Sequence, residues 1–183
     1  MKRPCWTLNH AAEGVYPQHQ AMGDGYDYAA PNSIRRLTHD ALPDFEPDLG
    51  TAVLHGHARL TDLLSSAPFS GVGYLVSGRL RAVLEGFALP THRFYPLAVT
   101  HRNRPVEGYA WLHVPGAQLP LTDSSTVAEA EAAIDAAGMA PLDLLKLTRP
   151  SRFAYCYVSD PLRGALAAAG VTGVRFGTAK LFR

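Results

Sequence analysis

The pattern of hydrophobic and polar residues predicts regular secondary structure only from about residue 51 onward. Runs rich in strand-forming residues predict strands at 51–54, 73–76, 94–100, 108–114, 142–147, 155–158 and 174–176. The runs at 94–100 and 108–114 are joined by polar residues and predict an antiparallel hairpin with a long loop. Leu60, Leu63 and Leu64 predict two helical turns over 58–65.

Three helices carry start and stop signals. Ser77 precedes an apolar stripe that extends to about residue 85, and its hydroxyl is suited to accept a hydrogen bond from an unpaired amide of the first turn. Thr126 and Glu129 form a capping box before an alanine-rich helix that stops at Gly138. Ser159 begins a third helix with a proline in its first turn, a position that tolerates the missing amide hydrogen.

The first and third helices belong to an internal repeat. At a constant spacing of 82 residues, Val76, Ser77 and Leu80 match Val158, Ser159 and Leu162. The match continues in Arg81, Leu84, Arg93 and Phe94, which correspond to Arg163, Leu166, Arg175 and Phe176. The sequence therefore predicts two similar strand–helix–strand units, near 73–99 and 155–179, in which both serines are helix caps and not nucleophiles.

Residues 1–50 lack such a pattern, because prolines and the Gly23-Asp24-Gly25 turn interrupt it. We expect an irregular N-terminal arm that packs on a core formed by residues 51–183, together making a single domain over 1–183. The predicted fold class is α+β, a mixed or antiparallel sheet with a few short helices.

Composition and charge narrow the function. Hydrophobic residues make up 47% of the 183 residues, as in a globular protein, and the net charge of +1 provides no overall field to recruit nucleic acid or an anionic membrane. No apolar run follows the basic N-terminus, so we expect a cytoplasmic protein without a membrane span. Cys5 and Cys156 share no motif and are interpreted as reduced thiols; one disulfide in an exported protein is the alternative.

No recognised catalytic motif occurs, and no cofactor is expected. Ser77 lies in Leu-Val-Ser-Gly-Arg rather than in a Gly-x-Ser-x-Gly turn, and no phosphate-binding loop ends in Gly-Lys-Ser/Thr. His55 and His57 would share one face of a strand and hold a metal, but no further ligand motif accompanies them. The stretch from Arg93 to Arg104 is the most basic part of the chain and is suited to phosphate or carboxylate.

Three segments resemble a known family. They are Leu-Val-Ser-Gly-Arg-Leu at 75–80, Phe-Tyr-Pro-Leu at 94–97, and Ser-Asp-Pro-Leu-Arg at 159–163 followed by Gly-Val-Thr-Gly-Val-Arg-Phe at 170–176. Together with Gly108–Val114 they are similar to bacterial immunity proteins of polymorphic toxin systems, the eleventh numbered immunity family, formerly a domain of unknown function. The resemblance covers roughly residues 58–178. It implies a protein that binds and neutralises a cognate toxin and has no catalytic residues.

Two functions follow as hypotheses. The first is an immunity protein whose toxin contact is the acidic stretch formed by Asp40, Asp44, Phe45, Glu46 and Asp48, because charge complementarity speeds protein capture. The alternative is a small metal- or phosphate-dependent hydrolase that uses His55, His57 and the Arg93–Arg104 stretch. A small-ligand or nucleic-acid module is disfavoured by the near-neutral charge and by the absence of any binding fingerprint.

Overall fold

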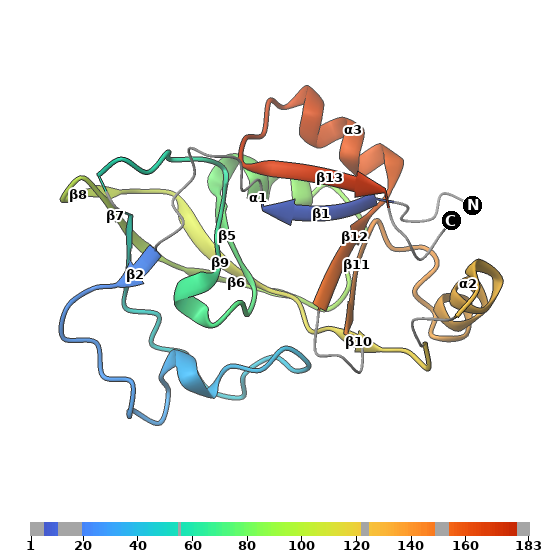
Figure 1. Cartoon of the computed structure of the whole chain (residues 1–183), viewed down its shortest axis with the longest axis horizontal. Helices are drawn as coiled ribbons and strands as arrows, with labels where there is room; N and C mark the ends of the chain where they lie inside the picture. The colour runs from blue at the N-terminus through green and yellow to red at the C-terminus, as the bar shows by residue number, and fades with distance from the viewer. Residues whose placement is uncertain (1–5, 11–19, 55, 122–124, 149–153, 179–183) are drawn as a thin grey trace.

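The computed structural model describes residues 6–10, 20–54, 56–121, 125–148 and 154–178, and it has an α+β fold built on three small sheets (Figure 1). The fold class predicted from the sequence is confirmed. Two of the sheets are related by the internal repeat, and the third lies beside the first of them. No helix in the described part of the chain is long and apolar enough to cross a membrane.

The first repeat forms a four-stranded sheet. Its strands, in spatial order, are β4 (Leu63–Leu64), β5 (Tyr74–Ser77), β9 (Tyr109–His113) and β6 (Arg93–Pro96). Helix α1 (Gly78–Leu84) connects β5 to β6. Because β9 is antiparallel to both, β5 and β6 run in the same direction with one strand between them, which makes a split strand–helix–strand unit.

The second repeat forms a five-stranded sheet of the same design. Its spatial order is β10 (Ala117–Gln118), β11 (Leu144–Thr148), β12 (Ala154–Val158), β1 (Trp6–His10) and β13 (Val174–Thr178). Helix α3 (Asp160–Ala168) connects β12 to β13 and lies against α1. Strand β1 separates β12 from β13 just as β9 separates β5 from β6.

The prediction that residues 1–50 form an irregular arm is wrong for Trp6–His10, which form strand β1. In β1 the apolar Trp6 and Leu8 alternate with Thr7 and Asn9, a period-two pattern too short to stand out in the sequence. The pairing register shows its role, because Leu8 lies opposite Phe176 just as Leu112 lies opposite Phe94. The N-terminal strand thus completes the second repeat from the other end of the chain (Figure 1).

The third sheet contains the remaining strands, in the order β2 (Gln20–Met22), β3 (Thr51–Leu54), β7 (Ala98–His101) and β8 (Arg104–Val106). The expected long-loop hairpin is only partly present. The predicted strand divides after Pro96, so that β6 pairs with β9 while β7 turns back on β8. Arg102 and Asn103 form a tight turn with φ of 53° and 58°, the left-handed region typical of two-residue hairpin turns.

The short helices follow their predicted caps. The Ser77 and Ser159 hydroxyls accept from the amides of Leu80 and Leu162, both at 3.2 Å. Helix α2 (Val127–Ala136) begins with the complete capping box of Thr126 and Glu129. The two helical turns predicted for 58–65 are absent, because that segment instead leads into β4.

Candidate functional site

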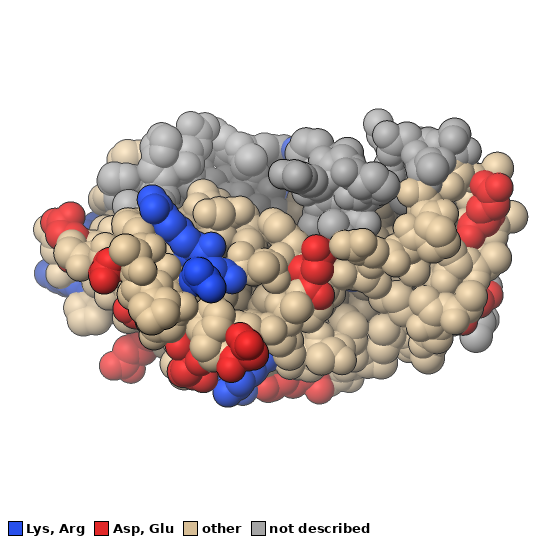
Figure 2. All heavy atoms as spheres, turned by 90° about the horizontal axis from the view of Figure 1, so that it is seen from below, with Lys and Arg blue, Asp and Glu red and all other residues tan. Residues whose placement is uncertain are grey.

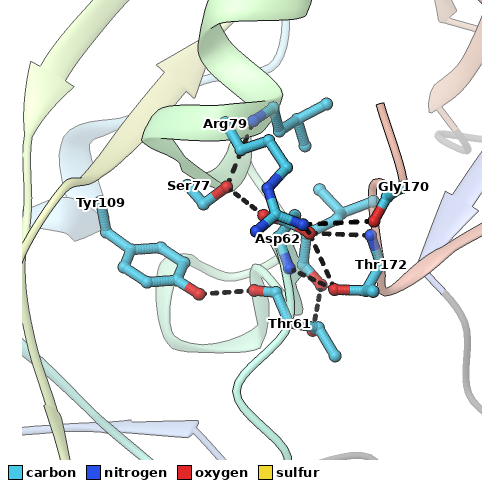
Figure 3. Close-up of polar contacts among 9 residues, drawn as sticks. Thr61, Asp62, Ser77, Arg79, Tyr109, Gly170 and Thr172 are labelled. Carbon is cyan, nitrogen blue, oxygen red and sulfur yellow. Dashed lines mark hydrogen bonds and ion pairs between the residues drawn. The ribbon is translucent and has the colours of Figure 1, made fainter. Parts of the chain in front are cut away.

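Asp62 is the centre of a polar network at the joint between the two repeats (Figure 3). Asp62 immediately precedes β4, and the residue is 8% exposed. One carboxylate oxygen accepts from the Ser77 hydroxyl at 2.6 Å, and the other accepts from the amide and the hydroxyl of Thr172, both at 2.8 Å. Thr172 follows α3, so one carboxylate joins the cap of the first repeat's helix to the loop of the second.

Asp143 makes the reciprocal connection. It precedes β11 as Asp62 precedes β4, and it accepts from the Ser159 hydroxyl at 2.6 Å. Its other oxygen accepts from the amide of Ala88, in the loop after α1, at 3.1 Å. The backbone carbonyls of the two aspartates also accept from the amides of Ser77 and Ser159, at 2.8 and 2.9 Å. The aspartate of each repeat therefore binds the helix-capping serine of its own repeat and a loop residue of the other repeat.

These contacts identify the network as structural. Burial is the largest single influence on Asp62 and opposes its ionisation, but the hydrogen bonds from Ser77 and Thr172 and the charge of Arg79 outweigh it and lower the pKa of Asp62. A carboxylate held ionised by fixed donors is a poor base. The Ser77 hydroxyl already donates to Asp62 and accepts from an amide, so no free proton relay remains for nucleophilic attack.

A cavity of about 190 Å³ lies between the two repeat sheets. Leu63, Leu64 and Tyr74 line it from the first repeat, and Lys146 and Cys156 line it from the second. Lys146 is 2% exposed, and its ammonium donates to the Val114 carbonyl at 2.8 Å. Burial lowers the pKa of Lys146, although the nearby Cys156 and Asp40 act in the opposite direction. Sequence patterns did not reveal this lysine, because it occupies an ordinary strand position.

Two other groups in this cavity hold their protons. Burial raises the pKa of the Cys156 thiol to about 11, so the thiol is protonated at neutral pH and is a weak nucleophile. Burial also raises the pKa of Tyr74 well above its ordinary value, and the nearby Cys156 acts in the same direction. Cys156 is a free thiol, as expected, and Cys5 lies outside the described residues.

A buried histidine adjoins the lysine. His113 is fully buried and stacks on Trp111 with 4.8 Å between ring centroids. Burial, followed by the charge of Lys146, lowers the pKa of His113 to about 4, so the imidazole is neutral at physiological pH. Burial and Lys146 also lower the pKa of His39. This interior polar cluster holds one ammonium beside neutral rings.

The predicted toxin contact lies in residues 20–50, a segment of net negative charge that we call the acidic segment. It carries six carboxylates and two arginines. All six carboxylate residues are exposed, including the acidic rim formed by Asp40, Asp44, Glu46 and Asp48. Phe45 is half-buried and packs on the core, so it anchors the rim instead of projecting from it. Figure 2, which views the molecule from below, shows scattered Asp and Glu side chains on this face with Lys or Arg side chains among them.

The residues of the alternative hydrolase are partly separated. Arg93 lies on β6, where it pairs with Glu46 at 3.4 Å and covers the ring of Tyr95. Arg102 and Arg104 lie on the third sheet instead, and the Arg102 guanidinium donates to the Gly56 carbonyl at 2.8 Å. That contact places the tight turn beside the exposed His57, while His55 lies outside the described residues. Within the described residues, no three His, Cys, Asp or Glu side chains gather as a metal site.

A repeat signal for Asp62 and Asp143 was present in the sequence. Both precede two leucines that start a strand, in Asp-Leu-Leu at 62–64 and at 143–145. The two copies of the motif lie 81 residues apart, one fewer than the two serines. A search for matches at the constant spacing of 82 residues therefore misses them. Fold and site together define a two-repeat α+β protein with split strand–helix–strand units. No protein-family model and no curated protein matches the chain.

Proposed function

We propose that this protein is an immunity protein that binds and neutralises a cognate bacterial toxin in the cytoplasm through the acidic segment. The observation that supports this most is the combination of many exposed carboxylates with a firmly fixed backbone. A preformed charged surface steers a basic partner and loses little conformational entropy on binding. The sequence resemblance to immunity proteins points to the same class.

The backbone of the acidic segment is fixed by its own hydrogen bonds. The Tyr26 hydroxyl donates to the Asp48 carbonyl at 2.6 Å and accepts from the Ile34 amide at 2.8 Å. The Asp48 amide donates to the Asn32 carbonyl at 2.9 Å. Ile34 and Leu49 are buried in the core, at 3% and 6% exposure. Apolar residues and Tyr26 thus face inward while the carboxylates face water.

Within the rim, Asp40 and Asp44 are best placed to meet a partner. Glu46 is partly neutralised by Arg93, and Asp48 accepts from the Gly50 amide at 2.9 Å, which ties it to the loop. We therefore assign the main steering charge to Asp40 and Asp44. A toxin that fits this surface would present lysines or arginines, as nucleic-acid-degrading toxins do to contact phosphate.

Co-expression with the toxins encoded beside the gene tests the proposal. We expect one of them to be neutralised and to bind the purified protein. Replacing Asp40 and Asp44 by Asn should lower the association rate by about two- to fivefold per charge and weaken its dependence on salt. The matched control replaces Glu107 by Gln and Asp135 by Asn, which removes equal charge outside the acidic segment. Failure of every neighbouring toxin to bind, or equal effects of the two double variants, would refute the proposed function or the proposed surface respectively.

The hydrolase remains the alternative proposal, since Arg102 lies beside the loop that carries His57. Metal analysis of the purified protein separates it from the first. Stoichiometric metal that disappears when His55 and His57 are replaced by Ala would favour a metal-dependent hydrolase over a toxin-binding protein.

A further inference from the structure

The cavity between the repeat sheets combines a buried cation with empty space. Its volume of about 190 Å³ exceeds the roughly 150 Å³ that suffices for a benzene-sized molecule. Lys146 and Cys156 lie directly opposite each other on β11 and β12, so their side chains share the face that borders the cavity. Tyr74 approaches from the other sheet.

Lys146 forms no ion pair with a carboxylate of the described residues, although Asp40 lies near enough for its charge to raise the pKa of Lys146. Its ammonium can donate three hydrogen bonds, and the Val114 carbonyl accepts one of them. A buried ammonium that no carboxylate contacts directly is costly, and proteins compensate such a charge or lose it. The cavity beside Lys146 gives an anion room to supply that charge.

The other walls restrict what kind of anion fits. Leu8, Leu63 and Leu64 provide apolar surface, whereas Tyr74 and Cys156 both carry protons at neutral pH and do not repel an anion. The mixture suits a small molecule with one anionic group and a short apolar part. A protonated thiol and an ammonium that already serves Val114 also argue for simple binding rather than covalent chemistry.

We propose that the cavity between the two repeat sheets is a binding site for a small organic carboxylate, whose anionic group pairs with Lys146 and whose apolar part contacts Leu63 and Leu64. The residues that line this site lie outside the acidic segment, and the proposal does not depend on toxin binding. It gives the joint between the repeats a ligand that stabilises the folded state by mass action.

The test uses benzoate and butyrate against their neutral counterparts benzamide and butyramide, with the full chain. The chain has three lysines, so protein labelled with ¹³C-lysine gives few signals, and Lys146→Met identifies the one from the cavity. We expect a saturable shift of that signal with at least one carboxylate, with a dissociation constant of about 1 mM or lower. The matching amide should bind at least about tenfold more weakly.

Controls make each outcome decisive. Lys146→Met should abolish the rise in melting temperature caused by the carboxylate, while Arg36→Met, which removes an exposed cation, should leave it unchanged. If Lys146→Met fails to fold, Lys2→Met and Lys180→Met identify the cavity signal by elimination, and its shift in the wild type still decides. No shift with either carboxylate, equal binding of amide and acid, or inorganic phosphate binding as tightly as benzoate would each overturn the proposal.

Discussion

Replacing Asp62 by Asn tests whether the joint between the repeats stabilises the whole fold. The substitution keeps the size of the side chain but removes its charge, and it turns one acceptor oxygen into a donor amide. In either orientation, that amide faces groups that now donate to Asp62, namely the Ser77 hydroxyl or the amide and hydroxyl of Thr172. At least one donor therefore loses its acceptor in a nearly buried place.

The magnitude follows from these contacts. A hydrogen bond to a charged group contributes about 1.5–3 kcal/mol, and an unsatisfied buried group costs about 1–3 kcal/mol. We expect Asp62→Asn to lower the free energy of unfolding by about 2–4 kcal/mol, a large part of what a domain of this size has. Asp143→Asn should cost about 1 kcal/mol less, because the Asp143 carboxylate accepts two hydrogen bonds and the Asp62 carboxylate accepts three.

The stabilisation that depends on the negative charge of Asp62 should disappear at low pH. The pKa of Asp62 is lowered in the folded state, so its stabilising contribution is fully present above the ordinary pKa of about 3.9 and is lost as the pH falls through the folded-state value. The difference between wild type and Asp62→Asn should therefore stay constant from pH 7 to about 5 and shrink below about pH 4.

Guanidinium denaturation followed by tryptophan fluorescence measures these differences. Asp44→Asn is the control, an exposed carboxylate expected to change stability by less than about 0.5 kcal/mol. A double-mutant cycle between Asp62→Asn and Thr172→Val should give a coupling of about 0.5 kcal/mol or more. If Asp62→Asn costs no more than Asp44→Asn, the two repeats are held together by their apolar contacts and the reasoning fails.

Three further substitutions probe the interior. Gly73→Ala should cost about 2–4 kcal/mol in the same denaturation assay, because Gly73 has φ of 70° and a Cβ there would collide with the Trp111 ring. The wild type should lose about 2–3 kcal/mol of its free energy of unfolding between pH 6.5 and about 4, and His113→Phe should abolish this loss. The reason is that the pKa of His113 is about 4 in the fold, so the unfolded chain binds the proton at higher pH than the folded chain does. A wild type equally stable at both pH values would contradict this. Lys146→Met should remove a rise in stability from neutral pH towards pH 10, which burial causes by lowering the pKa of Lys146 in the fold; an unchanged pH profile would show that the amine is not buried in solution.

The sequence predicted the parts of the fold that depend on local chemistry. Ser77 and Ser159 cap helices as predicted, since a hydroxyl before an apolar stripe needs only the adjacent amides to do so. The strand at Trp6–His10 was missed because five residues carry little periodic signal. Its place is fixed by partners far along the chain, since Trp6 lies opposite Val158 and Leu8 lies opposite Phe176. The cavity beside Lys146 was missed for the same reason, since its walls come from both repeats.

The two repeats also indicate where function resides. What they share is structural, because Asp62 with Ser77 and Asp143 with Ser159 make the same contact at the same distance of 2.6 Å. A function specific to this chain must therefore depend on what the repeats do not share. Relative to the Asp-Leu-Leu motifs, Lys146 occupies the position of Ser65, so the buried cation is unique to the second repeat.

The acidic segment is the second such difference. It comprises β2 and the residues that lead from β2 to β3, and the third sheet to which both strands belong is not part of either repeat. Because Ile34, Leu37 and Leu49 are buried and the carboxylates are exposed, this segment can change its surface charge without disturbing the joint at Asp62. A protein that must match one partner benefits from such a division, since specificity can vary on one segment while the paired repeats keep the fold.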